Sequence, residues 1–442
     1  MSPELLSFIG LGVVIVLMIF GVPIAIGFAG IALIVSWQLW GMDVTFSLFA
    51  IRSYGVMSNY SMVCVPLFVF MGSLLEKAGV AERLFDVVYI AFGRVRGGLA
   101  ITVIIISIIF GACTGIAGAA VVTIGLIAMP TMLKRGYEKG LIAGCICSGG
   151  GLGVIIPPSI VFILYGATAG VSISKLFAGG IIPGILLGGI YIAYIAIRYN
   201  FFQPSLAPPI PPEEREAVSG MKLARMIMLS FVPPVFLILA VLMSIFLGWA
   251  APTEAASLGA LGSLIVCAVY RRLSWKIIAD TAYVTMRITA MIMFIVLGAN
   301  LFTGVFLKAG AGGLMQDTIL GMNLTPMGTV LVMLVMIFVA GCFMDWIGIL
   351  YILIPIFAPI VKNLGMDPLW FGMLFCISLE LSYMTPPFAY CVFYFKGIAP
   401  SEITIADMYR GAIPYVVCQV VLLILLIYFP ELVTWLPNLL LG

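Results

Sequence analysis

Long apolar runs, separated by short polar segments, cover almost the whole chain. Runs such as residues 5–20, 227–247 and 417–429 show no alternation of apolar and polar positions. A spanning helix needs about 20 apolar residues. Backbone groups inside a bilayer must be hydrogen-bonded within the protein, so only helices or closed barrels cross it, and barrel strands alternate. The pattern therefore predicts an all-α polytopic membrane protein.

A polar stretch at 199–225 divides the chain into two halves that resemble each other. Four pairs of matching residues or doublets share an offset of 229 positions: Pro23 and Pro252, Gly30 and Gly259, Pro130 and Pro359, and Pro157-Pro158 and Pro386-Pro387. Repeated matches at one offset indicate an internal repeat. We therefore expect one repeat over 1–198, a cytoplasmic linker over 199–225 and a second repeat over 226–442.

Basic residues predict the topology. The first repeat has five apolar segments long enough to span a membrane, near 4–20, 22–40, 59–76, 138–166 and 176–198. The further apolar stretch at about 98–132 has Arg94 and Arg96 before it and Lys134 and Arg135 after it. Because Lys and Arg gather on the cytoplasmic side, this stretch predicts a re-entrant hairpin. Because five is an odd number of crossings, the second repeat must have the opposite orientation in the membrane. Its own hairpin is expected at about 325–362.

The remaining charges agree with this topology. With the N-terminus outside, only four of the 21 Lys and Arg residues fall on the outer face: Arg52, Lys175, Lys308 and Lys362. A model in which 98–132 crosses the membrane would place one of its basic flanks outside. We therefore favour the hairpin and expect both chain ends on the outer face of the membrane. The start of the chain lacks a basic signal region, so the first apolar stretch is expected to be retained.

Composition excludes several kinds of chemistry. The chain is 63% hydrophobic and 9% charged, whereas soluble domains carry about 25% charged residues. It contains no histidine, which excludes histidine-based triads and HExxH zinc sites. The nine cysteines lie singly in apolar segments, apart from Cys145 and Cys147, and are interpreted as small buried hydrophobes. A net charge of +3 suggests no nucleic-acid partner.

Each repeat contains two interruptions within apolar segments. In the first repeat these are a glycine-rich hairpin tip at 111–118 and a break at 148–159, inside a helix expected at about 138–166. The second repeat has a tip at 341–348 and a break at 378–388, inside a helix expected at about 368–395. Proline and glycine leave backbone groups unpaired, and such groups persist at membrane depth only where they line a cavity or bind a ligand. Matched breaks in inverted repeats indicate a transporter binding site.

These breaks predict a shared cavity that can hold both a cation and a carboxylate. Carbonyl and hydroxyl oxygens suit Na⁺, and the N-termini of half-helices attract carboxylates. The first Na⁺ site is expected among Gly111, Thr114, Gly115, Ser148, Gly149, Gly150 and Pro157. The second is expected among Gly341, Asp345, Glu380, Ser382, Thr385 and Pro386. The substrate site is expected among Gly151, Ser159, Thr385 and Pro387.

Three carboxylates are expected at membrane depth, namely Glu254, Asp345 and Glu380. Each costs about 2.5–3.5 kcal/mol or more there, so such groups rarely lack a role. Glu254 follows Pro252 and either caps a helix or has a functional role. Asp345 and Glu380 either bind an ion, directly or through a neighbouring group, or hydrogen-bond to broken backbone.

Several segments resemble the large membrane subunit of tripartite ATP-independent periplasmic (TRAP) transporters. They are the run from Asn59 to Gly79, Lys134-Arg-Gly-Tyr137, Ile156-Pro-Pro-Ser159, Lys175 to Gly184, Ala251-Pro-Thr-Glu-Ala255 and Leu379 to Pro387. The resemblance implies an elevator-type, Na⁺-driven importer of organic acids, with Na⁺ between each hairpin tip and its partner broken helix. It also implies two partners, a small four-helix membrane subunit and a soluble periplasmic substrate-binding protein.

Other functions are weighed against this one. A channel or exporter for organic anions that works without partners is also compatible with matched breaks. An intramembrane enzyme is disfavoured because histidine is absent and no pair of aspartates lies in facing motifs. The chain has no Walker A sequence, which argues against a built-in ATPase. No cofactor or transition metal is expected besides Na⁺ as the coupling ion.

Overall fold

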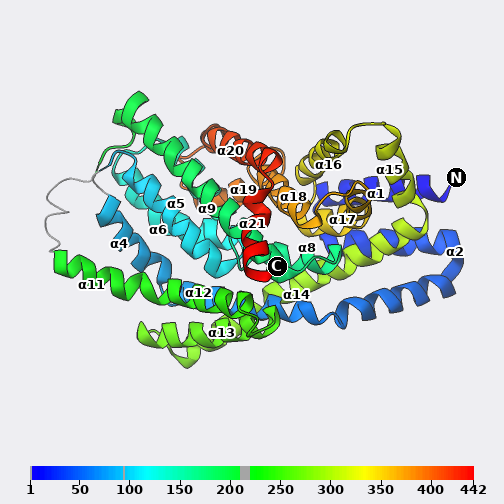
Figure 1. The fold of residues 1–442 in the computed structure, drawn as a ribbon, viewed down its shortest axis with the longest axis horizontal. Helices are drawn as coiled ribbons and strands as arrows, with labels where there is room; N and C mark the ends of the chain where they lie inside the picture. Colours follow the sequence, from blue (N-terminus) through cyan, green and yellow to red (C-terminus); the bar gives the residue numbers. More distant parts are fainter. Residues whose placement is uncertain (1, 93–94, 210–219) are drawn as a thin grey trace.

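The protein is described here by a computed structural model that covers residues 2–92, 95–209 and 220–442. Within these ranges the chain forms helices and no strands (Figure 1). Eight helices are long and apolar enough to cross a membrane, or up to ten if each bent pair counts as one span. The predicted all-α polytopic class is confirmed. Arg94 and residues 210–219 of the predicted linker lie outside the described residues.

The first half contains nine α-helices and three short helical turns in the described residues. They are α1 Pro3–Ile19, α2 Ile24–Met57, η1 Tyr60–Val63, α3 Cys64–Lys77, α4 Val80–Phe92, α5 Gly98–Thr114, α6 Ala117–Lys134, α7 Lys139–Ile155, α8 Ile160–Ala169, α9 Ile173–Ile197, η2 Arg198–Phe202 and η3 Pro204–Leu206. Helix α2 reverses direction at Gly41, which has a φ of 77°. The hydroxyls of Ser36 and Thr45 join its two parts at 2.9 Å. The segment predicted at 22–40 therefore ends at this turn.

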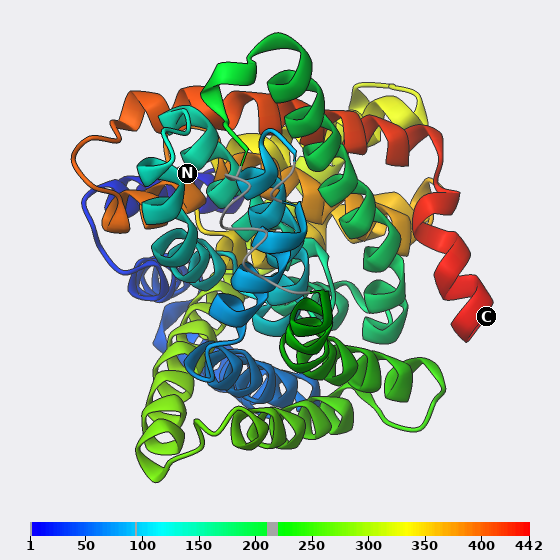
Figure 2. The same cartoon turned by 90° about the vertical axis from the view of Figure 1, so that its left-hand side faces the viewer.

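The second half contains eleven described helices. They are α11 Gly220–Ser230, α12 Val232–Phe246, α13 Pro252–Val269, α14 Trp275–Lys308, α15 Ala311–Gly321, α16 Pro326–Gly341, α17 Trp346–Asn363, α18 Pro368–Tyr383, α19 Tyr390–Ile398, α20 Ile405–Tyr428 and α21 Glu431–Leu441. Helix α14 packs along α2 and α3, and α20 packs along α7. In Figure 2, α20 crosses the top of the molecule and α13 lies at the bottom.

The helices of the two halves follow the same order. Shifted by 229 positions, the bounds of α6 coincide with those of α17. The bounds of α1, α5, α7 and α8 agree to within two residues with those of α12, α16, α18 and α19. Each half therefore has a helical hairpin (α5–α6 or α16–α17) followed by a helix pair with a Pro-Pro doublet at its break (α7–α8 or α18–α19). In Figure 1, α5 and α6 lie in the left half of the molecule, and α16 and α17 lie in the right half.

Two short helices were not predicted. Helix α4 in the first half and α15 in the second each lie just before a hairpin. The sequence of α4 carries Glu82, Arg83 and Asp86 among apolar residues, so it forms an amphipathic helix that is too short and too charged to read as a span.

The first part of the predicted linker packs against the first hairpin. The Gly97 N–H donates to the Ala207 carbonyl at 3.0 Å, and the Tyr137 hydroxyl donates to the Pro208 carbonyl at 3.1 Å. Burial raises the pKa of Tyr137 to about 12, so its hydroxyl remains a donor at neutral pH. The chain after α9 is thus fixed to the base of α5 and to the turn between α6 and α7.

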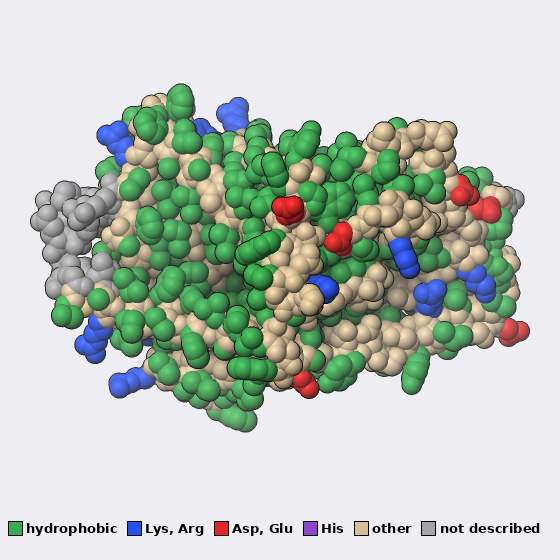
Figure 3. Space-filling view, in the orientation of Figure 1, with side chains coloured by type: hydrophobic (Ala, Val, Ile, Leu, Met, Phe, Trp, Pro, Cys, Tyr) green, Lys and Arg blue, Asp and Glu red, His purple; other side chains and the backbone are tan. Residues whose placement is uncertain are grey.

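Charged side chains are unevenly distributed on the visible face of the molecule (Figure 3). At the left end of this view, beside the start of α5 and the end of α9, the visible charges are Lys and Arg. The Asp and Glu side chains lie toward the centre and the right end. Hydrophobic side chains cover much of the surface between them, as expected for a protein that faces lipid.

Candidate functional site

Both hairpin tips and both broken helices meet around one cavity of about 190 Å³. Its lining includes residues of the first tip and its broken helix, Gly115, Ile116, Ala117, Val154, Ile160 and Val161. It also includes residues of the second tip and its broken helix, Asp345, Trp346, Ile347, Tyr383, Tyr390 and Tyr394. Residues of α2 and α14 close the remaining side. We call this space the tip cavity.

Asp345 is the acidic group of the tip cavity. Its side chain is 8% exposed and caps α17 by accepting a hydrogen bond from the Ile347 N–H at 3.1 Å. Three tyrosine rings line the cavity near it, and the rings of Tyr390 and Tyr394 have centroids 4.8 Å apart. Sequence reasoning missed these tyrosines. Two of them could have been found from the sequence, because Tyr390 and Tyr394 are four residues apart just after the second Pro-Pro doublet and therefore lie on one face of a helix.

Each tip lies directly against its own broken helix because glycines allow close approach. A Cβ atom added to Gly111 would lie 2.7 Å from the Cα of Gly153, which is closer than side-chain atoms approach. A Cβ atom added to Gly341 would lie 2.2 Å from the Oγ of Ser382. Gly115 has a φ of 61°, and an added Cβ would lie 3.0 Å from the Pro158 carbonyl oxygen. The carbonyl oxygens of Gly111 and Pro158 therefore lie at the first contact, and the Ser382 hydroxyl lies at the second.

The hydroxyls predicted as cation ligands, and that of Ser159, which was predicted for the substrate site, donate to carbonyls of their own local segments. Thr114 donates to Phe110 at 3.2 Å, Ser148 to Gly144 at 2.7 Å, Ser159 to Val154 at 2.5 Å, Ser382 to Leu379 at 2.5 Å and Thr385 to Leu381 at 2.8 Å. A hydroxyl that donates in this way keeps its lone pairs for a cation. Of the predicted site residues, Gly115 and Asp345 line the tip cavity. Pro387 lines a separate apolar cavity of about 810 Å³ beside the second tip.

The glycines at 149–151 pack three neighbouring helices against α7. Added Cβ atoms would meet Ser107 of α5 at Gly149, Val121 of α6 at Gly150 and Glu380 of α18 at Gly151. These three positions face different directions on one helix, so a side chain at any of them would push a different helix away. The observed geometry gives them a steric role.

Glu380 lies apart from the second tip. It is fully buried beside Gly151, and within the described chain neither of its carboxylate oxygens has a hydrogen-bond partner. Ser382, two positions along α18, faces Gly341 of the tip. Residues two apart on a helix point to nearly opposite sides. The structure therefore groups Glu380 with the first broken helix instead of with Asp345.

Glu254 is a helix cap. Its carboxylate accepts a hydrogen bond from the Ala251 N–H at 2.8 Å at the start of α13, and the side chain is exposed. Of the two roles that the sequence left open for Glu254, the geometry supports the capping role.

A multi-pass helical architecture with two hairpins and two broken helices around one cavity defines a membrane protein of the transporter class. A model of the family "Tripartite ATP-independent periplasmic transporter, DctM component" matches residues 11–432, and the chain belongs to this family. The resemblance to TRAP large membrane subunits is thereby confirmed, and the chain is a transporter subunit and not an enzyme.

Individual relatives agree with this family. The chain is 31% identical to the C4-dicarboxylate TRAP transporter large permease protein DctM of Vibrio cholerae, over 97% of each chain. It is 29% identical to the isethionate TRAP transporter permease protein DctMQ of Oleidesulfovibrio alaskensis, over 94% of this chain and 64% of that protein. The crystal structure of the Alcanivorax borkumensis YdaH transporter has a similar fold, with a TM-score of 0.62 and 17% identity over 88% of this chain and 89% of that one.

Proposed function

We propose that the protein is the large transmembrane subunit of a Na⁺-coupled transporter that imports an organic acid. The observation that carries this proposal is the tip cavity, where both hairpin tips and both broken helices converge. Movement of the tips would open or close this space, which is what a carrier needs to bind substrate in alternate states. The two named relatives are described as transporters of C4-dicarboxylates and of isethionate, both of which are organic anions.

Two Na⁺ ions bind, in this proposal, where each tip meets its broken helix. The first site draws on oxygens around Gly111, Thr114, Gly115 and Ser148, and the second on Gly341, Asp345, Ser382 and Thr385. Close backbone approach at Gly111 and Gly341 supports both positions. Bound Na⁺ would fix the hairpins and complete a site for the carboxylate of the substrate.

The proposal includes an elevator movement, two protein partners and a location in the bacterial inner membrane. A small four-helix membrane subunit stabilises the static helices, and a soluble periplasmic binding protein delivers the substrate. The family name describes tripartite periplasmic transporters, and the second relative carries the joint name DctMQ. Both chain ends are periplasmic in this proposal, which is supported for the N-terminus by its place opposite the end of the molecule where the visible charges are Lys and Arg.

Uptake into proteoliposomes tests the coupling. The chain is reconstituted with both partners, and uptake of radiolabelled organic acids is compared under an inward Na⁺ gradient and under an equal K⁺ gradient. Thr385→Val is expected to reduce Na⁺-dependent uptake about tenfold or more, because it removes a proposed ligand. Thr318→Val is the matched control, since Thr318 is exposed on α15 and also donates to the carbonyl four residues before it.

Two outcomes would contradict the proposal. Uptake that proceeds equally without Na⁺ would exclude the coupling. Flux that needs no binding protein and appears as current in planar bilayers would favour a channel.

A further inference from the structure

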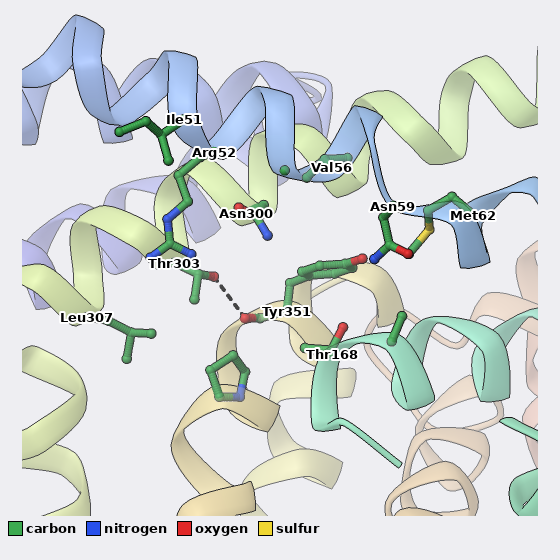
Figure 4. Close-up of a pocket in the computed structure, with 13 residues that line it drawn as sticks. Ile51, Arg52, Val56, Asn59, Met62, Thr168, Asn300, Thr303, Leu307 and Tyr351 are labelled. Carbon is green, nitrogen blue, oxygen red and sulfur yellow. Dashed lines mark hydrogen bonds between the residues drawn. The ribbon is translucent and has the colours of Figure 1, made fainter. Parts of the chain in front are cut away.

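A third cavity, of about 620 Å³, lies between α2, α14, α8 and α17, and it contains an arginine (Figure 4). Its polar lining comprises Arg52, Asn59, Thr168, Asn300, Thr303 and Tyr351. None of these residues lines the tip cavity. The volume is within the range of about 300–1,000 Å³ that is usual for small-molecule sites. We call this space the arginine cavity.

Arg52 is an uncompensated positive charge in this cavity. It is partly buried, no acidic residue lines the cavity, and within the described ranges Arg52 makes no ion pair. Its guanidinium group lies over Gly304 of α14, where an added Cβ would be 2.8 Å from the Arg52 Nε. The glycine therefore leaves room for the arginine head group. An arginine presents several N–H donors in a fork that matches a carboxylate.

The other polar groups add hydrogen-bond donors. The side-chain oxygen of Asn59 accepts from the Ser61 N–H at 3.1 Å, which turns the amide nitrogen of Asn59 toward the cavity and the side chain of Tyr351. Thr303 donates to the Tyr351 carbonyl at 2.8 Å, which holds α14 against α17 at the cavity wall. A cavity with a cation on one side, amide and hydroxyl groups elsewhere on its wall and apolar residues between them suits a small organic anion.

The location connects this cavity with the proposed transport path. Sequence charge places Arg52 on the outer face. Helix α17 contributes Asp345–Ile347 at its start to the tip cavity, and Tyr351 and Pro355 further along to the arginine cavity. At 1.5 Å per residue, these two groups are about 10 Å apart along one helix. A molecule released from the arginine cavity would therefore have a short distance to travel.

We propose that the arginine cavity is an outer binding site for the carboxylate group of the substrate, occupied before the substrate enters the tip cavity. Arg52 binds the carboxylate, and Asn59 orients the rest of the molecule. The proposal rests on the proposed function, because it assigns the first contact of the same organic acid.

Charged thiol reagents test the cavity without any uptake measurement. Asn300→Cys places a thiol in the cavity, whereas the nine native cysteines are buried. The full-length protein, in nanodiscs of uncharged phosphatidylcholine, is treated with anionic or cationic methanethiosulfonate reagents. With Arg52 present, we expect the anionic reagent to be favoured. Arg52→Gln should reduce the ratio of anionic to cationic rates about fivefold or more, as expected for removal of a nearby charge.

A matched control separates this local charge from the charge of the whole face. Lys308→Gln removes a positive charge that is exposed and lies over the Trp40 ring, outside the cavity lining. It should leave the ratio unchanged. Arg52→Lys keeps the charge but loses the fork, so it should preserve the reagent ratio. This variant also serves if Arg52→Gln does not fold.

Ligand protection tests the carboxylate itself. Millimolar succinate or lactate should slow labelling of Asn300→Cys, and this protection should weaken with Arg52→Lys and disappear with Arg52→Gln. Three results would overturn the proposal. Lys308→Gln could change the ratio of anionic to cationic rates as much as Arg52→Gln does, or protection by succinate or lactate could survive Arg52→Gln. The third is that labelling is slowed by phosphatidylglycerol added to the nanodisc and not by either acid. Labelling requires neither Na⁺ nor the partners. If the labelling results contradict the arginine cavity while Na⁺-dependent uptake is intact, this proposal fails and the proposed function stands.

Discussion

The contact between Gly341 and Ser382 gives a quantitative test of how closely the second tip must approach its broken helix. An alanine Cβ at position 341 would lie 2.2 Å from the Oγ and 2.5 Å from the Cβ of Ser382. Because carbon atoms pack at about 3.5–4.0 Å, the two helices must separate by about 1 Å or more. Otherwise Ser382 must leave its rotamer and lose its 2.5 Å hydrogen bond to the Leu379 carbonyl.

Such overpacking costs about 1–3 kcal/mol. Since 1.4 kcal/mol is a factor of ten, Gly341→Ala should weaken docking of the tip by about 5-fold to 150-fold. If Na⁺ binds at this contact, the half-saturating Na⁺ concentration should rise by a similar factor. The measurement is thermal unfolding of the purified protein in NaCl and in KCl at equal ionic strength, over a Na⁺ titration.

A double variant that exchanges the residue sizes on the two sides of this contact should restore the lost stability. In the double variant Gly341→Ala with Ser382→Gly, the side chain on α18 is gone, and the nearest remaining atom to the added methyl group is the Cδ1 of Ile349 at 3.8 Å. We expect most of the lost stability to return, less about 1 kcal/mol for glycine inside a helix. Gly189→Ala, on α9, is the control because nothing lies within 4 Å of its added Cβ.

The possible failures have different meanings. A Gly341→Ala protein with unchanged stability, or a double variant that does not recover, would refute the packing argument. A loss of stability without any change in the Na⁺ titration would refute the placement of Na⁺ at this contact.

Two further variants test contacts inside the molecule. Gly411→Ala on α20 would place a Cβ 1.9 Å from the Gly140 carbonyl oxygen of α7, so it should destabilise the protein by about 2–3 kcal/mol in thermal unfolding, whereas Gly397→Ala has open space and should not. Glu380→Gln replaces a buried carboxylate without hydrogen-bond partners by a neutral group of equal size, so the variant should be at least as stable as wild type in KCl. Glu380→Ala should lose about 2–4 kcal/mol because it leaves a cavity. A wild-type protein clearly more stable than Glu380→Gln would show that the charge is compensated.

Sequence reasoning located the hairpins and the breaks because glycine and proline act locally. The hairpins predicted at about 98–132 and 325–362 correspond to α5–α6 and α16–α17, whose outer bounds differ from them by at most two residues. The breaks coincide with the doublets at 157–158 and 386–387, since proline removes a helix donor wherever it occurs.

The roles of single residues in the site were harder to predict because they depend on which helices pack together. The glycines at 149–151 were expected to contribute to ligand sites, and no sequence pattern showed that each of them also faces a different helix. Glu380 was assigned to the second tip because it precedes the second doublet, yet it lies directly beside Gly151 of the first broken helix. The arginine cavity joins α2, α8, α14 and α17, which no local pattern connects.

The two tip contacts occupy equivalent places in the repeats but differ in chemistry. Gly111 meets Gly153, so only backbone separates α5 from α7, whereas Gly341 meets Ser382, which adds a hydroxyl. A cation at the first contact would therefore depend mainly on carbonyl oxygens, which no substitution removes, and would be sensitive to any added side chain. A cation at the second would also depend on the Ser382 hydroxyl and the Asp345 carboxylate. If Na⁺ binds at both contacts as proposed, one site is set by backbone geometry and the other is one that side-chain changes can adjust.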